Sequence, residues 1–340
     1  MENRNAKILP LAGLDRVILR NEVPLCSPFS AYIFPTTYCN FRCVYCGHKL
    51  SNEEYQATYG FPLETMEMGT YRNTIDQLSE FPSRLKTLSL TGQGEPLLHP
   101  RLPEMIAYAK QKNVSQRIEF ITNGSLLRQP LAQALVDAGT DGIRISLQGL
   151  SSRKYREVCG VDVDFDVFRE QIAWLYQHKK QCEIFVKILD IALEPGEDQR
   201  FYELFSPIAD RVYIEQCRPV YSEVAQAEWT AEADRYGRTH SPRNVCPLCF
   251  FMLSVFPNGD VFPCDAIYRP VCLGNVNSGR LIEMWNGESL RGFWRLQLRE
   301  GRRVNFRCVK CCAPDDVSHP EDVLDDAAQQ ILERLEKQWD

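Results

Sequence analysis

The sequence lacks an apolar run of about 18 residues, the length that a helix needs to cross a membrane. Its first eleven residues contain Arg4 and Lys7 but no apolar stretch, so they do not form a secretory signal. Basic residues are outnumbered by acidic ones, 39 to 45, and the formal net charge is -6. Because nucleic acids bind strongly positive surfaces, we expect neither a nucleic-acid partner nor a membrane association. These absences predict a cytoplasmic protein.

Cysteine is the residue that the chain has in excess, with 14 in 340 residues. Without a secretory signal, such a density indicates metal binding or catalysis rather than a set of disulfides. Three cysteines lie between positions 39 and 46, and seven lie between positions 246 and 312. Cys26 precedes them all, and the stretch between holds only Cys159, Cys182 and Cys217. The sequence therefore predicts two metal-binding regions separated by an ordinary core.

Short apolar runs alternate with helical patterns from about residue 30 to residue 219. This alternation predicts an α/β fold in which βα units form a parallel sheet. The predicted strands cover residues 31–35, 87–91, 118–122, 142–147, 184–189 and 212–215. The predicted helices cover residues 68–81, 102–112, 130–138, 165–178 and 197–209. Six repeats fit a partial (β/α)6 TIM-like barrel, whose functional residues lie at the C-terminal ends of the strands.

The pattern changes after residue 244. Pro257-Asn258-Gly259-Asp260 predicts a β-hairpin turn, and two short helices are predicted at 281–285 and 290–298. An amphipathic helix is predicted at 321–337. The expected organisation is an N-terminal extension (1–29), a barrel core (30–222), a polar connector (223–244), a small cysteine-rich domain of hairpin and helices (245–316) and a C-terminal helix (317–340).

The first cysteine group, Cys39, Cys43 and Cys46, has the spacing C-x3-C-x2-C and directly follows the first predicted strand. Three thiolates on one tight loop suit a [4Fe–4S] cluster, which takes four cysteine-like ligands, and they leave one iron open. A structural zinc site with His48 as fourth ligand is the alternative, although zinc ligands usually come as matched pairs.

This loop resembles that of the radical S-adenosylmethionine (SAM) superfamily. The resemblance implies that the three cysteines hold a [4Fe–4S] cluster whose open iron binds the amino and carboxylate groups of SAM. It also implies that a reductant such as flavodoxin or ferredoxin drives cleavage of SAM to a 5′-deoxyadenosyl radical, which abstracts hydrogen from a substrate. Tyr45 stands at an aromatic position that lies near the adenine in the family.

Two further implied cofactor contacts follow the second predicted strand. The segment 90–96, Leu-Thr-Gly-Gln-Gly-Glu-Pro, is similar to the family's Gly-Gly-Glu segment. Gly92 and Gly94 would let the backbone approach a ligand, and Glu95 would accept hydrogen bonds from the methionyl ammonium of SAM.

The next strands end in polar residues that extend the resemblance. Asn123 follows the third strand as a candidate SAM ligand, with a turn-forming role as the alternative. Ser146 and Gln148 end the fourth strand and resemble the ribose contacts of the family, although Gln148 replaces a residue that is commonly acidic. Lys187 or Asp190 is a further candidate for the SAM carboxylate or the substrate, with pairing at the core edge as the favoured alternative.

The second cysteine region resembles the first half of the SPASM pattern, an auxiliary-cluster domain found behind many radical SAM cores. Cys249 and Cys264 flank the hairpin glycine Gly259, and Cys308-x2-Cys311 follows later. The full pattern requires cysteines at 317 and 321, where this chain has valine and glutamate. The resemblance therefore implies the shortened form called twitch, with one auxiliary [4Fe–4S] cluster.

The auxiliary ligand set stays open at this point. Cys249, Cys264, Cys308 and Cys311 form the twitch-like set, and Cys246 with Cys249, Cys264 and one downstream cysteine forms the rival. Cys272 is expected to be a packing residue. A zinc ribbon is the structural alternative for the whole region, because paired C-x2-C elements can hold zinc.

A fully liganded auxiliary cluster suits electron transfer, so the expected reaction is oxidation (dehydrogenation) at a carbinol carbon, as in twitch enzymes of aminoglycoside assembly. Epimerisation is the second possibility, and Cys217 is the candidate catalytic residue that would return hydrogen, against a role as a small buried hydrophobe. Glu215 and Arg218, beside it, would bind a polar substrate such as a sugar or an aminocyclitol.

Two other functions compete with this one. The first is maturation of a ribosomally made peptide by cross-linking or epimerisation. Only about 30 residues precede the first strand, too few for the leader-recognition domain of many such enzymes. The second is a non-catalytic iron–sulfur or zinc-binding protein, which would have no need of residues such as Glu95, Asn123 and Ser146.

Overall fold

A computed structural model describes residues 6–10, 15–221, 232–316 and 319–339. Six parallel strands lie side by side in chain order and form the centre of the sheet. They are β2 (Ser30–Ile33), β3 (Leu85–Ser89), β4 (Ser115–Thr122), β5 (Gly142–Leu147), β6 (Glu183–Leu189) and β7 (Arg211–Glu215). The predicted partial (β/α)6 barrel is confirmed, with every predicted strand within a few residues of its observed position.

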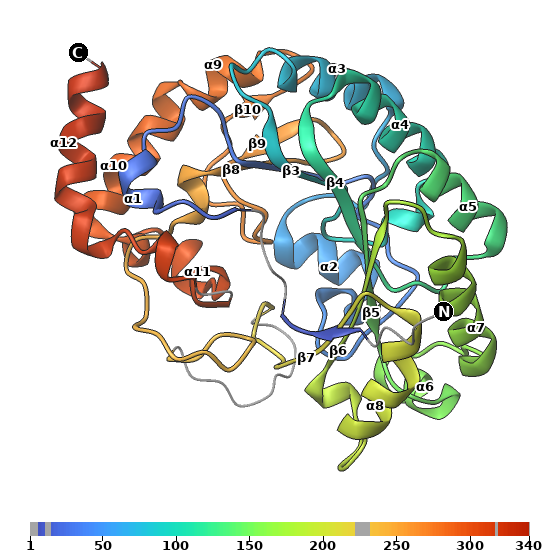
Figure 1. Cartoon of the computed structure of the whole chain (residues 1–340). Coiled ribbons are helices and arrows are strands. Elements are labelled where there is room, and N and C mark those ends of the chain that lie inside the picture. Colours follow the sequence, from blue (N-terminus) through green and yellow to red (C-terminus); the bar gives the residue numbers. More distant parts are fainter. Residues whose placement is uncertain (1–5, 11–14, 222–231, 317–318, 340) are drawn as a thin grey trace.

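The helices that connect these strands cover the outer face of the curved sheet (Figure 1). They are α3 (Met68–Leu78), α4 (Leu102–Lys112), α5 (Gln129–Asp137), α6 (Ser152–Cys159), α7 (Phe165–His178) and α8 (Asp198–Phe205). On β5, Ile143 and Ile145 belong to the core beneath these helices. Because side chains alternate along a strand, Arg144 and Ser146 point to the inside of the barrel.

Two helices in the segments after β2 and β5 were not predicted. In α2 (Asn52–Tyr59), the Ser51 hydroxyl accepts from the amide of Glu54, and the Glu54 carboxylate accepts from the amide of Ser51. The sequence contains this capping box, but no helical periodicity of apolar residues follows it, so the helix was not predicted. The Ser151 side chain caps α6 in a similar way, by accepting from the amide of Lys154.

The C-terminal region extends the same sheet, which the sequence did not predict. Strand β8 (Met252–Val255) pairs in parallel with β2, and the hairpin strand β9 (Asp260–Phe262) and β10 (Gly274–Asn275) follow in antiparallel order. At the opposite edge, β1 (Lys7–Ile8) pairs with β7. The remaining helices are α1 (Leu19–Glu22), α9 (Leu281–Trp285), α10 (Glu288–Glu300), α11 (Ala313–Asp316) and α12 (Ala328–Trp339).

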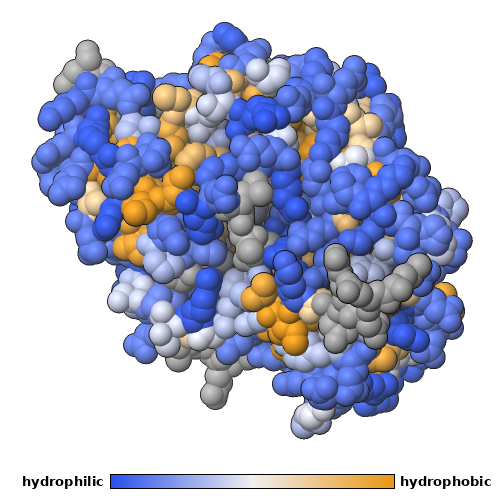
Figure 2. Space-filling model, viewed as in Figure 1, coloured by the Kyte–Doolittle hydropathy of each residue, from blue (hydrophilic) through white to orange (hydrophobic). Residues whose placement is uncertain are grey.

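The final helix begins later than predicted, at Ala328 instead of residue 321. The Asp325 carboxylate accepts from the amides of Asn244 and Val245, at 2.8 and 3.2 Å, and so anchors the preceding segment to the connector. This tertiary contact replaces the first helical turns with two short 3-10 turns. Within the described ranges, no helix has the length and apolarity to span a membrane. Figure 2 shows a mostly hydrophilic face with a few small apolar areas.

Candidate active site

A cavity of about 370 Å³ lies at the C-terminal ends of the barrel strands. Its lining brings together ten site residues predicted for the first cluster and for SAM, although they come from four separate segments of the chain. These residues are Cys39, Cys43, Tyr45, Cys46, Gly92, Gly94, Glu95, Asn123, Ser146 and Gln148. Lys187, Glu215, Cys217 and Arg218 line the same cavity.

The cysteine loop after β2 is held by backbone hydrogen bonds to the end of α6. Arg42 N donates to Cys159 O at 3.0 Å, and Val44 N donates to Val158 O at 2.8 Å. The Cys159 thiol hydrogen-bonds to Cys43, and this bond and burial raise the pKa of Cys43 well above its usual range. No sequence pattern links Cys159 to the loop, since 113 positions separate Cys159 from Cys46.

The three thiols of this loop suit a metal cluster. Burial raises the pKa of Cys39 to about 12, so this thiol is neutral until a cluster binds and displaces its proton. Three thiolates that face a cavity leave room for the open iron that a second ligand requires.

The zinc alternative with His48 has a specific obstacle. His48 Nε2 lies 2.6 Å from Gln93 O, and its ring stacks on Tyr55 with the ring centres 4.5 Å apart. Burial also lowers the pKa of His48. The Nε2 atom of His48 is therefore already hydrogen-bonded to Gln93 O. Across the described ranges, no group of three or more His, Cys, Asp or Glu side chains is placed to hold a single metal ion.

Glu95 is buried and accepts three hydrogen bonds from the protein. Thr122 Oγ1 donates at 2.6 Å, Asn123 N at 2.7 Å and Leu97 N at 3.0 Å. Burial raises the pKa of Glu95 to about 7, although the three donors act against this rise. Glu95 therefore ties the loop after β3 to the end of β4, and its place in the SAM pocket remains a prediction.

The other predicted SAM ligands also have protein partners. Asn123 Nδ2 donates to Asn40 Oδ1 at 2.8 Å, which joins the end of β4 to the cysteine loop. The Tyr45 hydroxyl donates to Gln148 Oε1, and Gln148 Nε2 donates to Ser146 O at 3.1 Å. These bonds fix the rotamers of residues that line the cavity, as a preorganised cofactor pocket requires.

The two glycines of segment 90–96 are required by contacts within the protein. A Cβ at Gly92 would lie 2.2 Å from the ring of Phe34. A Cβ at Gly94 would lie 2.5 Å from both Thr36 O and Tyr38 O. Both glycines therefore allow a close approach to the end of β2, which seats the cysteine loop against β3, and their approach to a ligand stays a prediction.

A chain of buried and half-buried charged side chains lies along one wall of the cavity. Lys187 Nζ lies 2.8 Å from Glu215 Oε2, and Arg235 Nη1 lies 3.3 Å from the same oxygen. Arg235 also pairs with Asp316, and Arg218 Nε lies 3.8 Å from Asp316 Oδ1. Sequence reasoning missed Arg235 and Asp316, because each lies in a polar segment with no motif around it.

Burial and pairing shift the pKa values of two residues in this charged wall, Lys187 and Glu215. Burial lowers the pKa of Lys187, and Glu215 offsets this only in part. Burial would raise the pKa of Glu215, but Lys187 and Arg235 outweigh it and lower the pKa. Asp190, a candidate ligand from the sequence, accepts from Cys217 N at 2.9 Å and so positions Cys217, which agrees with the favoured alternative of pairing at the core edge.

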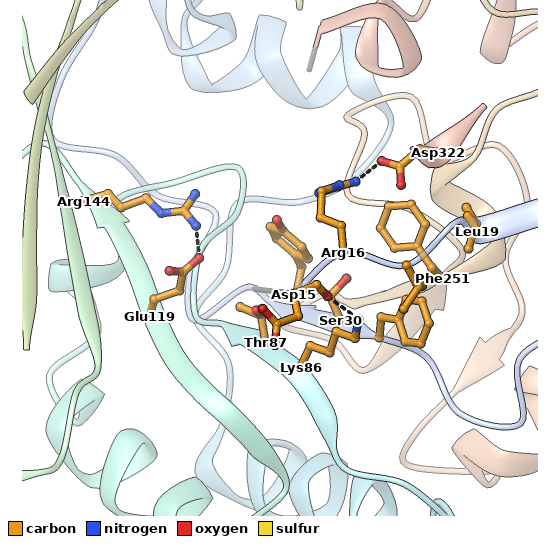
Figure 3. Close-up of a pocket in the computed structure, with 13 residues that line it drawn as sticks. Asp15, Arg16, Leu19, Ser30, Lys86, Thr87, Glu119, Arg144, Phe251 and Asp322 are labelled. Carbon is orange, nitrogen blue, oxygen red and sulfur yellow. Dashed lines mark hydrogen bonds and ion pairs between the residues drawn. The ribbon is translucent and has the colours of Figure 1, made fainter. Parts of the chain in front are cut away.

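The barrel interior stays polar below this cavity. A second cavity of about 180 Å³ opens near the start of β2 and β3, with the Glu119–Arg144 pair of β4 and β5 at its wall (Figure 3). Arg16 pairs there with Asp322, and Lys86 Nζ donates to Asp15 O at 2.7 Å. The inside of the barrel is therefore lined with charges rather than filled with apolar side chains.

A third cavity lies in the C-terminal region and collects five cysteines: Cys246, Cys249, Cys264, Cys308 and Cys311. Trp294 Nε1 donates to Cys249 O at 2.8 Å and so anchors the loop that carries Cys249. Burial raises the pKa of Cys246 to about 11. Five thiols, two of them buried and three half-buried, surround one apolar cavity, which is one more than the four ligands that a [4Fe–4S] cluster requires.

The remaining two cysteines of this region lie elsewhere. Burial raises the pKa of Cys312 to about 12, and its closest charged neighbours are Asp316, Arg235 and Arg218 of the charged wall. Cys272 is exposed, so its prediction as a packing residue was wrong. It lies in the link between β9 and β10 at the edge of the sheet, where no layer covers it.

Two family models match the chain. Residues 33–198 match the model described as the radical SAM superfamily, and residues 246–313 match the SPASM model, described as an iron-sulfur cluster-binding domain. The chain belongs to the radical SAM superfamily. This radical SAM enzyme uses SAM, a SAM-binding [4Fe–4S] cluster and an auxiliary iron–sulfur cluster in its SPASM domain.

The curated relatives match only part of this radical SAM enzyme. A "Probable GTP 3',8-cyclase" of Methanococcus maripaludis is 35% identical over 123 residues, 36% of this chain and 37% of the relative. The GTP 3',8-cyclase of Chlorobaculum tepidum is 33% identical over 123 residues, 36% of this chain and 34% of the relative. The chain thus aligns with about a third of the length of these relatives.

Solved structures share the fold over most of the chain. SuiB of Streptococcus suis bound to the precursor peptide SuiA has a TM-score of 0.62 at 16% identity, over 92% of this chain and 78% of that one. BtrN in complex with AdoMet and 2-DOIA has a TM-score of 0.52 at 18% identity, over 83% and 91%. At these identities the likeness concerns the fold.

Proposed function

We propose that this radical SAM enzyme oxidises a carbinol carbon of a polar, hydroxylated small molecule such as a sugar or an aminocyclitol. The observation that carries the proposal is the paired charges of Lys187, Glu215 and Arg235, which line the same cavity as the cysteine loop; Asp316 pairs with Arg235 behind them. Removing a charged group from water costs free energy unless the group is paired and hydrogen-bonded. The hydroxyl groups of a substrate are suitable hydrogen-bond partners for such charges.

The proposal assigns the two iron–sulfur clusters to two groups of cysteines. Cys39, Cys43 and Cys46 would hold the SAM-binding cluster, and four of the five cysteines of the third cavity would hold the auxiliary cluster. When bound, these groups supply a carbon radical that takes a hydrogen atom and an acceptor for one electron.

The chain's own residues bind the substrate and move its proton. Arg235 and Lys187 would donate hydrogen bonds to substrate oxygens, and Glu215 would fix their positions. Lys187 is the candidate for moving the hydroxyl proton, because it lines the cavity and burial lowers its pKa. The polar interior that continues to the Glu119–Arg144 pair would keep this proton within reach of water.

Epimerisation is the second candidate, because Cys217 lines the same cavity as the cysteine loop. Its thiol would return a hydrogen atom to the opposite face of the carbon, and an external reductant would then restore the thiol. A peptide substrate draws support from the fold that the chain shares with SuiB, whose structure contains a precursor peptide. A nucleotide substrate draws support from the name of the GTP 3',8-cyclases.

Anaerobic reconstitution followed by a 5′-deoxyadenosine assay tests the proposal. With dithionite as reductant, we expect SAM cleavage that polyols or aminocyclitols stimulate and that short peptides do not. About eight bound irons without any SAM cleavage would refute catalysis and favour a carrier protein. If Cys217→Ala abolishes product formation while SAM cleavage persists, epimerisation replaces oxidation. An unaffected Cys217→Ala protein supports oxidation.

A further inference from the structure

An apolar and basic patch lies directly beside the auxiliary-cluster cavity. It consists of Arg303, Val304, Phe306, Val309 and Lys310, all of them exposed. Phe306 exposes 73% of its surface, Val309 54% and Val304 51%, and these are among the most exposed large apolar residues in the described part of the chain. Such exposure of an aromatic residue is typical of a surface that another molecule covers.

The patch is held rigidly. The buried guanidinium of Arg302 donates to Asp315 Oδ2 at 2.5 Å and to Arg243 O at 2.9 Å. Asn305 Oδ1 accepts from the amides of Arg307 and Cys308, at 2.9 and 3.2 Å. The exposed side chains therefore extend from an ordered loop, which lowers the entropy lost on binding.

The same loop supplies cluster ligands. Cys308 and Cys311 line the auxiliary cavity, and so does Arg307. The Arg307 guanidinium lies over the ring of Phe306, 5.2 Å from its centre. One layer of side chains thus separates the patch from the cavity, which is a short path for an electron.

The charge of the patch selects its partner. No acidic residue occurs between Gly301 and Cys312, whereas Arg302, Arg303, Arg307 and Lys310 are basic. The whole chain carries a net charge of -6, so this segment is a local positive area on a negative protein. Opposite charges guide encounters between proteins, and small interfaces below about 1,200 Å² are common among redox partners.

We propose that this patch docks an acidic one-electron carrier protein of the flavodoxin class, which takes the electron that the auxiliary cluster receives during turnover. One electron leaves the reduced cluster and enters the oxidised flavin, which takes up a proton from water and becomes the neutral semiquinone. This docking proposal depends on one part of the proposed function, namely that the auxiliary cluster accepts and donates single electrons.

The test uses a protein in which the auxiliary cluster is the sole electron source, Cys39→Ala/Cys43→Ala/Cys46→Ala. It is reduced, freed of dithionite and mixed with oxidised flavodoxin, and the appearance of semiquinone gives a second-order rate constant. In this background, Arg303→Glu/Lys310→Glu and Phe306→Ser are each expected to lower that constant about tenfold. In Arg303→Glu/Lys310→Glu, the rate constant is also expected to depend less on the salt concentration.

The control is Arg153→Glu/Lys180→Glu, two exposed basic residues in α6 and just after α7, outside the C-terminal region that carries the patch. Iron content and cluster absorbance confirm that each variant is folded. An unchanged rate constant in both patch variants would overturn the proposal. So would a dimer of this chain that Phe306→Ser dissociates, since a second copy would then be the occupant.

Cross-linking gives an independent readout. Lys310 provides the amine of the patch, so a carbodiimide is expected to join Lys310 to a carboxylate of flavodoxin. Lys310→Arg keeps the charge and is expected to keep the rate constant while losing the cross-link. Absence of any cross-link at Lys310 would refute the patch. SAM cleavage by the wild-type enzyme with dithionite does not require the carrier. If this SAM cleavage does not occur, the result counts against the proposed function and not against the docking patch.

Discussion

Arg235 Nε donates a hydrogen bond of 3.0 Å to Asp316 Oδ1 and thereby joins the segment after β7 to α11 of the SPASM domain. Through Nη1 Arg235 also donates to Glu215 Oε2, so one guanidinium links two carboxylates. A lysine carries the same charge but lacks the planar fork that can bridge them.

Arg235→Lys is therefore expected to lower substrate oxidation about tenfold to a hundredfold, the usual cost of a misplaced binding group. SAM cleavage without substrate should stay near the wild-type rate. Arg238→Lys, in the same segment, is the control, because Arg238 pairs with Asp234 and does not line the cavity. Equal turnover by Arg235→Lys and the wild-type enzyme would contradict the role of the charged wall.

Glu95 predicts a pH dependence of the apoprotein's stability. Burial raises its folded pKa to about 7 from 4.5. A carboxyl group with a raised pKa contributes stability fully below about pH 4.5 and loses it as the pH rises through about 7. Between these values, the wild-type apoprotein should lose up to about 3 kcal/mol of unfolding free energy that Glu95→Gln does not lose. Urea denaturation of both proteins at several pH values measures this, and parallel profiles would show the prediction to be wrong.

Iron content tests the auxiliary ligand set. Cys249→Ala and Cys264→Ala are each expected to reduce bound iron from about eight to about four atoms per chain, because both possible ligand sets need them. We expect Cys246→Ala to keep both clusters, since the twitch-like set does without it. Cys272→Ala, at an exposed cysteine, is the control. Loss of four irons in Cys246→Ala would select the rival set.

Two glycine variants separate packing from chain flexibility. Gly94→Ala should destabilise the protein by about 1–3 kcal/mol, since its Cβ would lie 2.5 Å from backbone oxygens that a side-chain rotation cannot move. Gly69→Ala in α3 has no atom within 4 Å of its Cβ and should stabilise the helix by up to about 1 kcal/mol. Thermal or urea unfolding of both variants gives the comparison, and equal effects would contradict it.

The barrel and the cysteine loop were predictable because each rests on a local signal. Alternating apolar runs predicted β2 to β7, and the spacing of Cys39, Cys43 and Cys46 predicted their shared loop. Placement of Glu95, Asn123 and Ser146 in one cavity followed from the rule that strand ends gather at one face. The partners that hold them were not predictable, because Thr122, Asn40 and Phe34 form ordinary packing contacts without any pattern.

The charged wall and the joined sheet depend on contacts between distant segments. Arg235 and Asp316 are 81 positions apart, and nothing in either segment indicates the other. The pairing of β8 with β2 joins residues more than 200 positions apart. A hairpin signal at Gly259 predicts β9 beside β8, but it does not say which edge of the barrel sheet β8 will complete.

That pairing has a consequence for how the chain is made. Strand β2 is synthesised early, yet the partner on its second edge ends at Val255, so the ribosome must add some 220 residues before this edge is covered. Until then the nascent chain presents open backbone groups beside the empty cysteine loop, a template for pairing with other chains. Chaperone binding during synthesis would act within this interval.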